Sequence, residues 1–235
     1  MKKIAVYMGD GRIYRMMETA AKSLLYHNKV DRVYFLIDNP AFPYELPKEI
    51  FCINVSRQKY FVPMERNPNF HPTYGYMTWM RAALSKIFPY EDRVLLLDPD
   101  TLVTGDITGL WETDLTDYYL AAVQETRNNN HTKVPYFNAG VMLMNLEKLR
   151  RDGMDDKLIY EINTVAYEHL EQDVINYLCD GKIMSLPSDY NCSFVTDPTP
   201  NAKIFHYLSR DKDKFWRFGK QYEEMTWQEV LNHDN

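Results

Sequence analysis

Apolar and polar positions follow two different periods along the chain. From Ile13 to Leu25 the apolar residues stand three and four positions apart, which is the spacing of one face of an α-helix. Short apolar runs at 33–37 and 50–55 are rich in β-forming residues and are bounded by Asp, Asn and Pro. Such runs are typical of strands buried in a parallel sheet. A run at 4–8 predicts the first strand.

The same two patterns continue to about residue 190. They predict three more strands, at 94–97, 120–123 and 141–145, and a late short strand at 204–205. They also predict three more helices, at 75–88, 154–168 and 171–180. The segment 39–72 holds six of the twelve prolines and is expected to be mostly loop. Thr226-x-x-Glu229 is a capping box that opens a last helix. This alternation predicts an α/β sandwich with a mostly parallel sheet, and no repeat or linker divides the chain.

The charge and composition of the chain limit the kinds of molecule that it is expected to bind. The 27 basic against 33 acidic residues give a net charge of −6, which argues against nucleic acid. No apolar stretch approaches a membrane span, and the run after the first three residues is too short for a signal peptide. The three cysteines, Cys52, Cys179 and Cys192, are far apart and form no Cys-x-x-Cys. We therefore expect a cytoplasmic protein without disulfides, and leave a peripheral membrane contact open.

The candidate chemistry centres on Asp98-Pro99-Asp100. An Asp-x-Asp is common by chance, and a second one occurs at 211–213, but this one directly follows a predicted strand. Ligands of open α/β sheets bind at the carboxyl ends of strands. On an extended chain the two carboxylates would face the same side and could converge on Mn²⁺ or Mg²⁺. His206, after the late strand, is a candidate third ligand, and the alternatives are a solvated strand end and a surface histidine.

Four segments, in chain order, resemble glycosyltransferase family 8. They are DRVLLLDPDTLVTGDITGLWETDL, YFNAGVMLMNLEKLR, LEQDVINYL and LPSDYNC. The resemblance covers about 4–26 and 76–216. The family contains retaining, metal-dependent enzymes with the GT-A fold, among them lipopolysaccharide galactosyl- and glucosyltransferases and glycogenin. It implies one Rossmann-like GT-A domain over 1–235, with a nucleotide-binding half (1–125) and a sugar and acceptor half (126–235).

The resemblance also implies roles for the nucleotide and metal site. Asp98, Asp100 and His206 match the manganese ligands of the family. Asp10 matches the contact to uracil, and Arg81 matches an arginine that touches the donor's diphosphate or sugar. A UDP-hexose, with galactose or glucose, is the expected donor, and a glycan or another hydroxyl compound is the expected acceptor.

Other matches fall in the sugar pocket. Asn138 and Gly140 match the Asn-Ala-Gly that lines it, and Glu171 stands where the family often has aspartate. Gln172 matches a glutamine beneath the anomeric carbon, whose carbonyl dipole can stabilise the oxocarbenium-like sugar. Asp173 matches a carboxylate that holds the donor sugar's hydroxyls. Retention could follow from front-face attack or from double displacement through a carboxylate such as Asp173, and both routes stay open.

The lysine motif departs from the family. An alignment without gaps matches Lys212 to the lysine that pairs with the leaving diphosphate. An alignment on Trp216, which corresponds to the tryptophan that closes the family's motif, matches Lys214 instead. Ser209 replaces a glycine, and Ile13 stands where an aromatic ring often stacks on uracil. These departures leave a catalytically silent UDP-sugar-binding module as an alternative. A phosphohydrolase of the haloacid-dehalogenase type is the other, although its Asp-x-Asp lies near the N-terminus.

Overall fold

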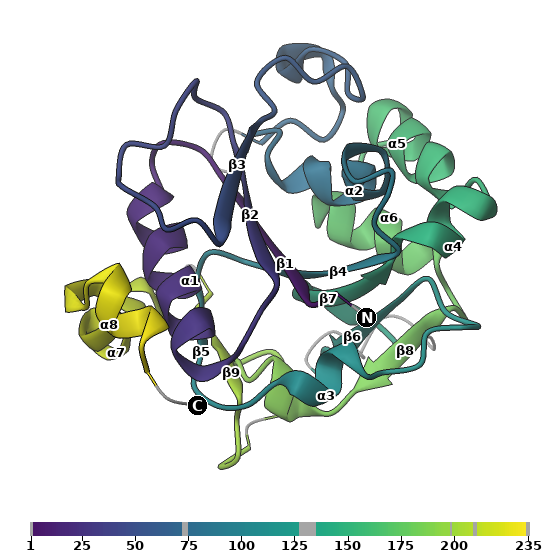
Figure 1. The fold of residues 1–235 in the computed structure, drawn as a ribbon. Coiled ribbons are helices and arrows are strands. Elements are labelled where there is room, and N and C mark those ends of the chain that lie inside the picture. Colours follow the sequence, from purple (N-terminus) through teal and green to yellow (C-terminus); the bar gives the residue numbers. More distant parts are fainter. Residues whose placement is uncertain (1, 72–74, 127–134, 198, 209–210, 234–235) are drawn as a thin grey trace.

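A computed structural model describes residues 2–71, 75–126, 135–197, 199–208 and 211–233 (Figure 1). Its centre is a seven-stranded sheet in the order β3-β2-β1-β4-β7-β6-β8. The strands of this sheet are β1 (Ile4–Gly9), β2 (Arg32–Ile37), β3 (Ile50–Asn54), β4 (Arg93–Leu97), β6 (Leu120–Gln124), β7 (Phe137–Asn145) and β8 (Ile183–Leu186). The pairings of β7 with β4 and β6 are antiparallel, and the other pairings in this sheet are parallel. The predicted mostly parallel α/β sheet is therefore confirmed.

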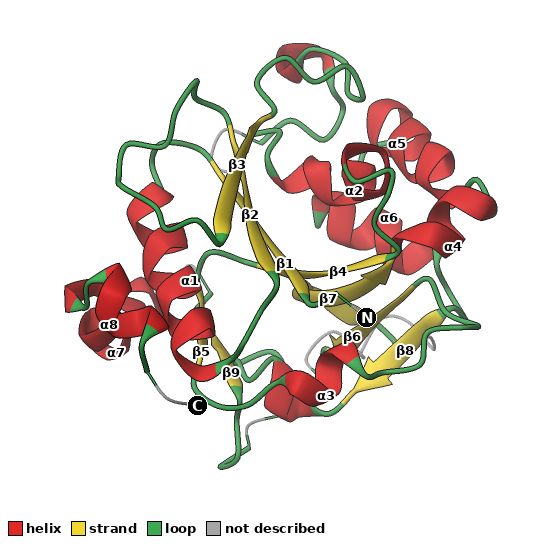
Figure 2. Cartoon of the chain, in the orientation of Figure 1, coloured by secondary structure: helices red, strands yellow, loops and turns green. Residues whose placement is uncertain are grey.

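Helices cover both faces of the sheet (Figure 2). They are α1 (Tyr14–His27), α2 (Leu84–Ile87), α3 (Thr108–Trp111), α4 (Leu146–Arg151), α5 (Met154–Thr164), α6 (Leu170–Leu178), α7 (Lys212–Glu224) and α8 (Trp227–Leu231). Short 3₁₀ helices are η1 (Met64–Arg66), η2 (Thr78–Ala83) and η3 (Ser188–Tyr190). Neighbouring residues of β4 alternate between the two cores: Leu96 packs on the side of α4 to α6, and Leu97 on the side of α1 and α3. This period-two division explains why each central strand is apolar throughout.

The helix expected at 75–88 is wrong in its detail. The segment forms η2 and the single turn α2, and Pro89 follows shortly after α2 ends. Trp79, Met80 and Arg81 are all buried. Because these consecutive side chains are all buried, the core encloses the segment on several sides, and tertiary packing outweighs the local preference for an α-helix.

Helix α7 occupies a stretch for which the sequence pattern predicted no helix. Phe215, Gly219 and Tyr222 recur at helical spacing and are buried, while charged residues cover the outer face. Phe215 and Tyr222 pack with Met16 of α1 and Leu102 of the strand β5 (Thr101–Val103). β5 pairs antiparallel with β9 (Ile204–His206) to form a separate two-stranded sheet.

Candidate functional site

Polar residues gather at one edge of the main sheet. β1, β4 and β6 run in the same direction, so the residues after their carboxyl ends, Asp10, Asp98 and Glu125, lie at the same edge. β7 runs in the opposite direction, so its first residues, Asn138 to Gly140, also lie there. This is the edge at which open α/β sheets bind ligands.

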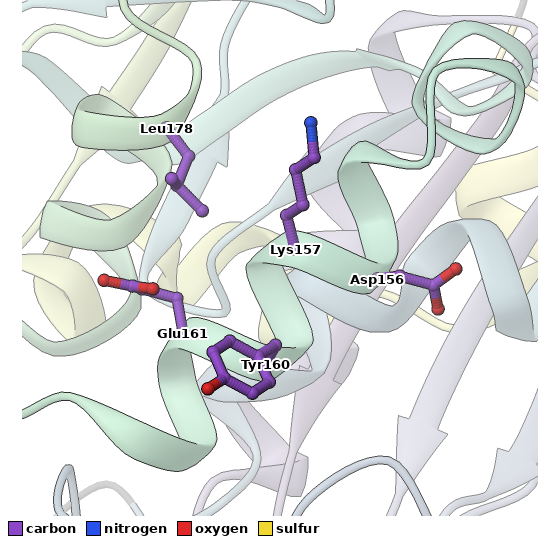
Figure 3. A pocket seen from close by; sticks show the side chains of 5 residues that line it. All are labelled: Asp156, Lys157, Tyr160, Glu161 and Leu178. Atoms are coloured by element: carbon purple, nitrogen blue, oxygen red, sulfur yellow. The ribbon is translucent and has the colours of Figure 1, made fainter.

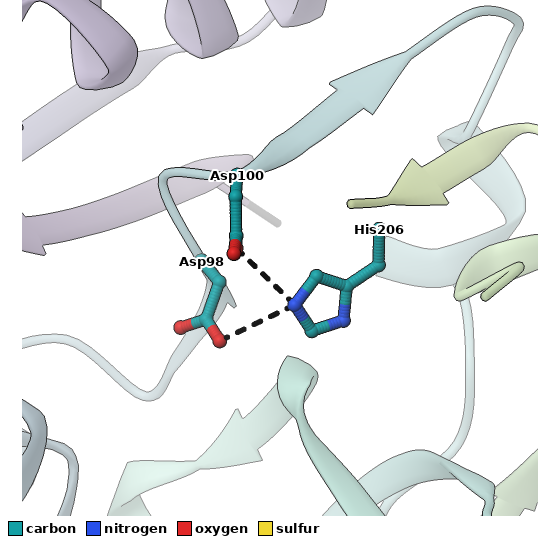
Figure 4. Close-up of side chains that lie close together, drawn as sticks. All are labelled: Asp98, Asp100 and His206. Atoms are coloured by element: carbon teal, nitrogen blue, oxygen red, sulfur yellow. Dashed lines mark ion pairs between the residues drawn. The ribbon is translucent and has the colours of Figure 1, made fainter. Parts of the chain in front are cut away.

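Asp98, Asp100 and His206 converge at this edge (Figure 4). The ligand atoms that the three residues can offer all lie within 4.8 Å of one another. His206 Nε2 stands 3.2 Å from Asp100 Oδ1 and 3.6 Å from Asp98 Oδ2. Two carboxylates and one imidazole suit a divalent cation such as Mn²⁺ or Mg²⁺, so the residues present form a potential metal site.

A turn, and not an extended strand end, brings the two carboxylates together. β4 ends at Leu97, and the backbone N–H of Thr101 donates to the carbonyl of Asp98 at 3.1 Å, which closes a β-turn over Asp98 to Thr101. The Thr101 hydroxyl donates to the same carbonyl at 2.7 Å. The convergence agrees with the sequence prediction, but the extended geometry assumed for it is wrong, because Pro99 occupies the second turn position that its fixed φ favours.

Asn191 fixes which nitrogen of His206 faces the carboxylates. The N–H of Gly140 can only donate, and it donates to Asn138 Oδ1, so the amide of Asn191 that lies 2.8 Å from the same oxygen must be its donating NH₂. Asn191 Oδ1 is then an acceptor, 3.0 Å from His206 Nδ1. Nδ1 therefore carries a proton, and Nε2 is the nitrogen available to a cation.

The surroundings of His206 fit that role. Its ring is buried, and Nε2 makes no hydrogen bond of ordinary geometry. Burial alone lowers the pKa of His206, but the carboxylates of Asp100 and Asp98 outweigh that effect, so the pKa is raised. Burial raises the pKa of Asp98, against the opposing charge of Arg81. A buried nitrogen that faces two carboxylates and has no hydrogen-bond partner has the chemistry of a metal ligand.

Gly140 makes room for the imidazole. A Cβ atom at this position would stand 2.6 Å from His206 Nδ1 and 2.9 Å from Nε2, closer than real Cβ contacts. The backbone of β7 can approach the ring only without a side chain. The resemblance placed Gly140 in the sugar pocket. In the structure, the absence of a side chain at Gly140 leaves space for the ring of His206.

Arg81 lies between two acidic residues. Its guanidinium donates to Asp98 Oδ1 at 2.6 Å and to the carbonyl of Ala139 at 2.8 Å, and its Nε lies 3.4 Å from Glu171 Oε1. Burial raises the pKa of Glu171, and the charge of Arg81 opposes that rise. Arg81 and Glu171 are both almost fully buried, so they hold each other and the turn at Asp98 in place.

The amide of Gln172 is oriented by two neighbours. Its NH₂ donates to Glu125 Oε1 at 3.2 Å and to the hydroxyl of Tyr136 at 3.1 Å, while its carbonyl accepts from the N–H of Ala139 at 2.9 Å. Glu125 Oε1 also accepts from the amide of Asn138 at 2.8 Å. A continuous set of hydrogen bonds therefore joins Gln172 to the metal cluster, in the order Gln172, Glu125, Asn138, Asn191, His206.

Asp173 is engaged on both oxygens. Oδ1 accepts from Tyr136 at 2.5 Å, and Oδ2 accepts from the backbone N–H of His169 at 2.8 Å. Leu170, the first residue of α6, has a φ of 53°, a conformation that costs a leucine about 1 kcal/mol or more. These contacts hold the strained start of the helix that carries Gln172 and Asp173.

The remaining predicted residues lie at the margins of this network. Both oxygens of Asp10 accept from Arg12, whose hydrogen bonds outweigh burial and lower the pKa of Asp10. Lys212 begins α7 with an exposed side chain, and Lys214 pairs with Asp211 at 2.7 Å. In the described residues no ion pair joins either lysine to the metal cluster. Ser209 lies outside the described residues.

A surface hollow of 430 Å³ between α5 and α6 lies apart from the site (Figure 3). Its lining, which includes Lys157, Tyr160 and Leu178, contains none of the predicted site residues. The edge of the sheet, and not this hollow, holds the candidate chemistry.

Sequence reasoning missed three residues of the network. Glu125 follows the apolar strand β6, so the rule that singled out Asp98 would also have found it. Tyr136 stands immediately before β7 and opens the YFNAGVMLMNLEKLR segment, but no role was assigned to it. Asn191 lies in the LPSDYNC segment, but its neighbour His206 comes from a strand fifteen positions later, which no local pattern reveals.

Comparison with known proteins places this architecture among the GT-A glycosyltransferases. The crystal structure of the glycosyltransferase GlyE from Streptococcus pneumoniae superposes with a TM-score of 0.74 at 28% identity, over 99% of this chain and 62% of that one. The galactosyltransferase LgtC, solved with donor and acceptor sugar analogues, superposes with a TM-score of 0.68 at 20% identity, over 96% and 98%, which shows the shared fold.

The sequence comparisons define the family. Residues 13–219 match the profile of glycosyl transferase family 8. GlyE is 30% identical over 98% of this chain and 63% of its own length, and GlyA of the same organism is 30% identical over 96% and 34%. The chain belongs to glycosyltransferase family 8. It spans less than two thirds of these two relatives' length. In the described residues no helix has both the length and the apolar character to cross a membrane.

Proposed function

We propose that the chain transfers a hexose, galactose or glucose, from a UDP-hexose to a hydroxyl group of an acceptor glycan with retention at the anomeric carbon. The observation that carries this proposal is the buried Nε2 of His206, which faces Asp98 and Asp100 at the ligand-binding edge of a family 8 chain. Asp98, Asp100 and His206 would hold Mn²⁺, or Mg²⁺, as their donor set favours.

Breaking the bond between sugar and diphosphate builds negative charge on the leaving oxygen. The bound cation would supply Lewis-acid stabilisation of that charge. Arg81 adds a fixed positive charge beside Asp98, and Lys212 is proposed to reach the diphosphate from the start of α7. Asp10, at the end of β1, is proposed to contact the base. Its carboxylate would then accept a hydrogen bond from a ring N–H of the base in place of the one from Arg12.

Positive charge develops on the sugar at the same time. The NH₂ of Gln172 donates to Glu125 and Tyr136, and its carbonyl accepts from the N–H of Ala139, so the amide dipole is held in one orientation. We propose that this carbonyl stabilises the oxocarbenium-like carbon, with Asn138, Gly140, Glu171 and Asp173 lining the sugar pocket. A dipole that is already oriented costs no reorganisation when the reaction occurs.

Of the two routes to retention, front-face attack has the better support. In a double displacement Asp173 would attack the sugar, yet Tyr136 and the N–H of His169 engage its two oxygens and lower its nucleophilicity. In front-face attack the departing phosphate oxygen takes the proton of the acceptor hydroxyl, and no protein nucleophile is needed.

We further propose that 1–235 acts as one GT-A domain, with 1–125 as the nucleotide-binding half and 126–235 as the sugar and acceptor half. The three cysteines are free, which supports a cytoplasmic site of action.

Turnover of UDP-galactose and UDP-glucose, measured with Mn²⁺ and again in EDTA, tests the proposal. Metal-dependent release of UDP is expected, together with UDP binding that weakens at least tenfold in EDTA. Equal UDP affinity in both conditions would rule out the metal bridge. Binding without turnover would instead identify a silent sugar-nucleotide-binding module, and hydrolysis of p-nitrophenyl phosphate in place of transfer would identify a phosphohydrolase.

A further inference from the structure

A second cleft lies beside strand β9, and His206 of the metal cluster is one of its lining residues. It measures 590 Å³ and is bounded by β9, by residues 192–194 and by α7. Its volume is in the range of small-molecule sites. Side chains alternate along a strand, so Phe205 faces the cleft while Ile204 lies in the main core.

Aromatic rings line this cleft in a row. The ring of Tyr207 is stacked with Phe205 at 6.3 Å and 27°, and with Phe218 of α7 at 6.1 Å and 23°. Phe218 is 52% exposed and Phe194, which also lines the cleft, is 36% exposed. These two rings are open to solvent and are suited to stacking on a flat, partly apolar ligand.

Apart from His206, which belongs to the metal cluster, the charged residues that line the cleft carry no net charge. Asp211 and Lys214 form an ion pair at 2.7 Å within the lining and cancel each other. Ser193 and Gln221 add a hydroxyl and an amide, which both donate and accept hydrogen bonds. A neutral ligand with many hydroxyl groups matches this combination better than a phosphate or an acidic chain does.

Strand β9 cannot extend its sheet across the cleft. One edge pairs with β5 from Ile204 to His206, and Phe205 forms a bridge to Cys192 on the other side. Recognition of an extended peptide by strand addition needs an open edge, so the paired edges of β9 disfavour that partner. The backbone N–H of Tyr207 donates to the carbonyl of Asp100 at 2.8 Å, so one wall of the cleft is bonded directly to the metal cluster.

We propose that the cleft is a subsite for a neutral oligosaccharide. The inference rests on the proposed function, under which this oligosaccharide is the part of the acceptor chain that lies away from the reacting hydroxyl. The exposed ring of Phe218 stacks on a sugar face, and Ser193 and Gln221 hydrogen-bond to hydroxyl groups.

Saturation-transfer NMR and calorimetry on the whole chain, with maltopentaose and lacto-N-neotetraose as neutral probes, test this inference. Phe218→Ala should weaken binding of the better probe by about tenfold or more, the scale of losing one buried aromatic face. Tyr90→Ala is the matched control, because Tyr90 is 93% exposed and lies outside the cleft. Gln221→Ala, on the exposed side of α7, supplies a second variant should Phe218→Ala fail to fold.

Absence of binding by both neutral probes would overturn the inference, as would equal loss in Phe218→Ala and Tyr90→Ala. Tighter binding of a hyaluronan hexasaccharide, which is anionic, would also overturn it. Binding of UDP with Mn²⁺ should be unchanged in Phe218→Ala. If UDP-hexose is turned over but the neutral probes do not bind, only the cleft inference fails. If the probes bind through Phe218 but no UDP-hexose is used, only the proposed function fails.

Discussion

Asn191 Oδ1 accepts a hydrogen bond from His206 Nδ1 at 3.0 Å, and through it a completely buried amide determines how the imidazole meets Asp98 and Asp100. The NH₂ of the same amide donates to Asn138, which is itself bonded to Glu125. One asparagine thus links the potential metal site to the residues around Gln172.

Asn191→Ala should weaken Mn²⁺ binding by about 10- to 100-fold, the usual effect of losing a partner of a metal-bound histidine. Titration of Mn²⁺ in the presence of UDP measures the change. Asn191→Asp keeps an acceptor for Nδ1 and should recover part of the affinity, while Asn201→Ala, at an exposed position, should change nothing. Wild-type Mn²⁺ affinity in a folded Asn191→Ala protein would contradict the assignment.

Asp98→Asn and Asp100→Asn should abolish transfer and leave the fold intact, because each removes a ligand charge at the sheet edge and no core volume. Steady-state kinetics with UDP-hexose provide the measurement. Asp213→Asn, in the other Asp-x-Asp, is the matched control and should retain full activity. If either site variant keeps more than about a tenth of the wild-type kcat/KM, a loss below about 1.4 kcal/mol, the metal site lies elsewhere.

Gly140→Ala should displace the imidazole of His206, since the new methyl group would stand 2.6 Å from Nδ1. Mn²⁺ affinity should fall by about tenfold or more, the range found when support of a ligand is lost. Gly105→Ala is the control, because a Cβ there meets its nearest neighbour, Lys203, at 3.8 Å, an ordinary contact. Equal Mn²⁺ affinity in the two variants would show that the ring has room to move.

Glu125→Ala should lower kcat by about 10²-fold, the scale on which a misplaced catalytic group loses rate, with a smaller effect on donor KM. The variant removes the acceptor that the amides of Gln172 and Asn138 share. Glu125→Gln retains one carbonyl oxygen that can accept both bonds, so it should recover most of the rate. A donor KM that rises as steeply as kcat falls would point to loss of sugar binding instead.

Lys212→Ala should lower kcat by about 10²-fold or more, the scale of one lost donor to the transition state. Lys214→Ala should cost less than tenfold, since Lys214 already pairs with Asp211. Kinetics of both variants at saturating UDP-hexose measure the ranking. The opposite ranking would mean that, relative to the family's motif, this chain has two extra residues between His206 and Lys214.

Hydrophobic periodicity by itself predicted the α/β class and seven of the nine strands in the described residues; it missed the short strands β5 and β8. Each central strand is apolar along its whole length because it is buried on both faces, and α1 shows its apolar face without interruption. The same pattern placed Asp98 and Asp100 after a strand. Where buried side chains follow one another, as in 78–83, and where charges surround a short apolar face, as in α7, the periodic signal failed.

Tertiary structure alone decided which distant residues meet. β7 inserts antiparallel between β4 and β6, and this brings its first residues beside the carboxyl ends of its neighbours. The pairing of β9 with β5 then carries His206 to the turn at Asp98, and the missing side chain of Gly140 leaves space for its ring. Strand pairing and close packing act between residues far apart in the chain, so the partnership of His206, Asn191 and Glu125 has no counterpart in any local pattern of the sequence.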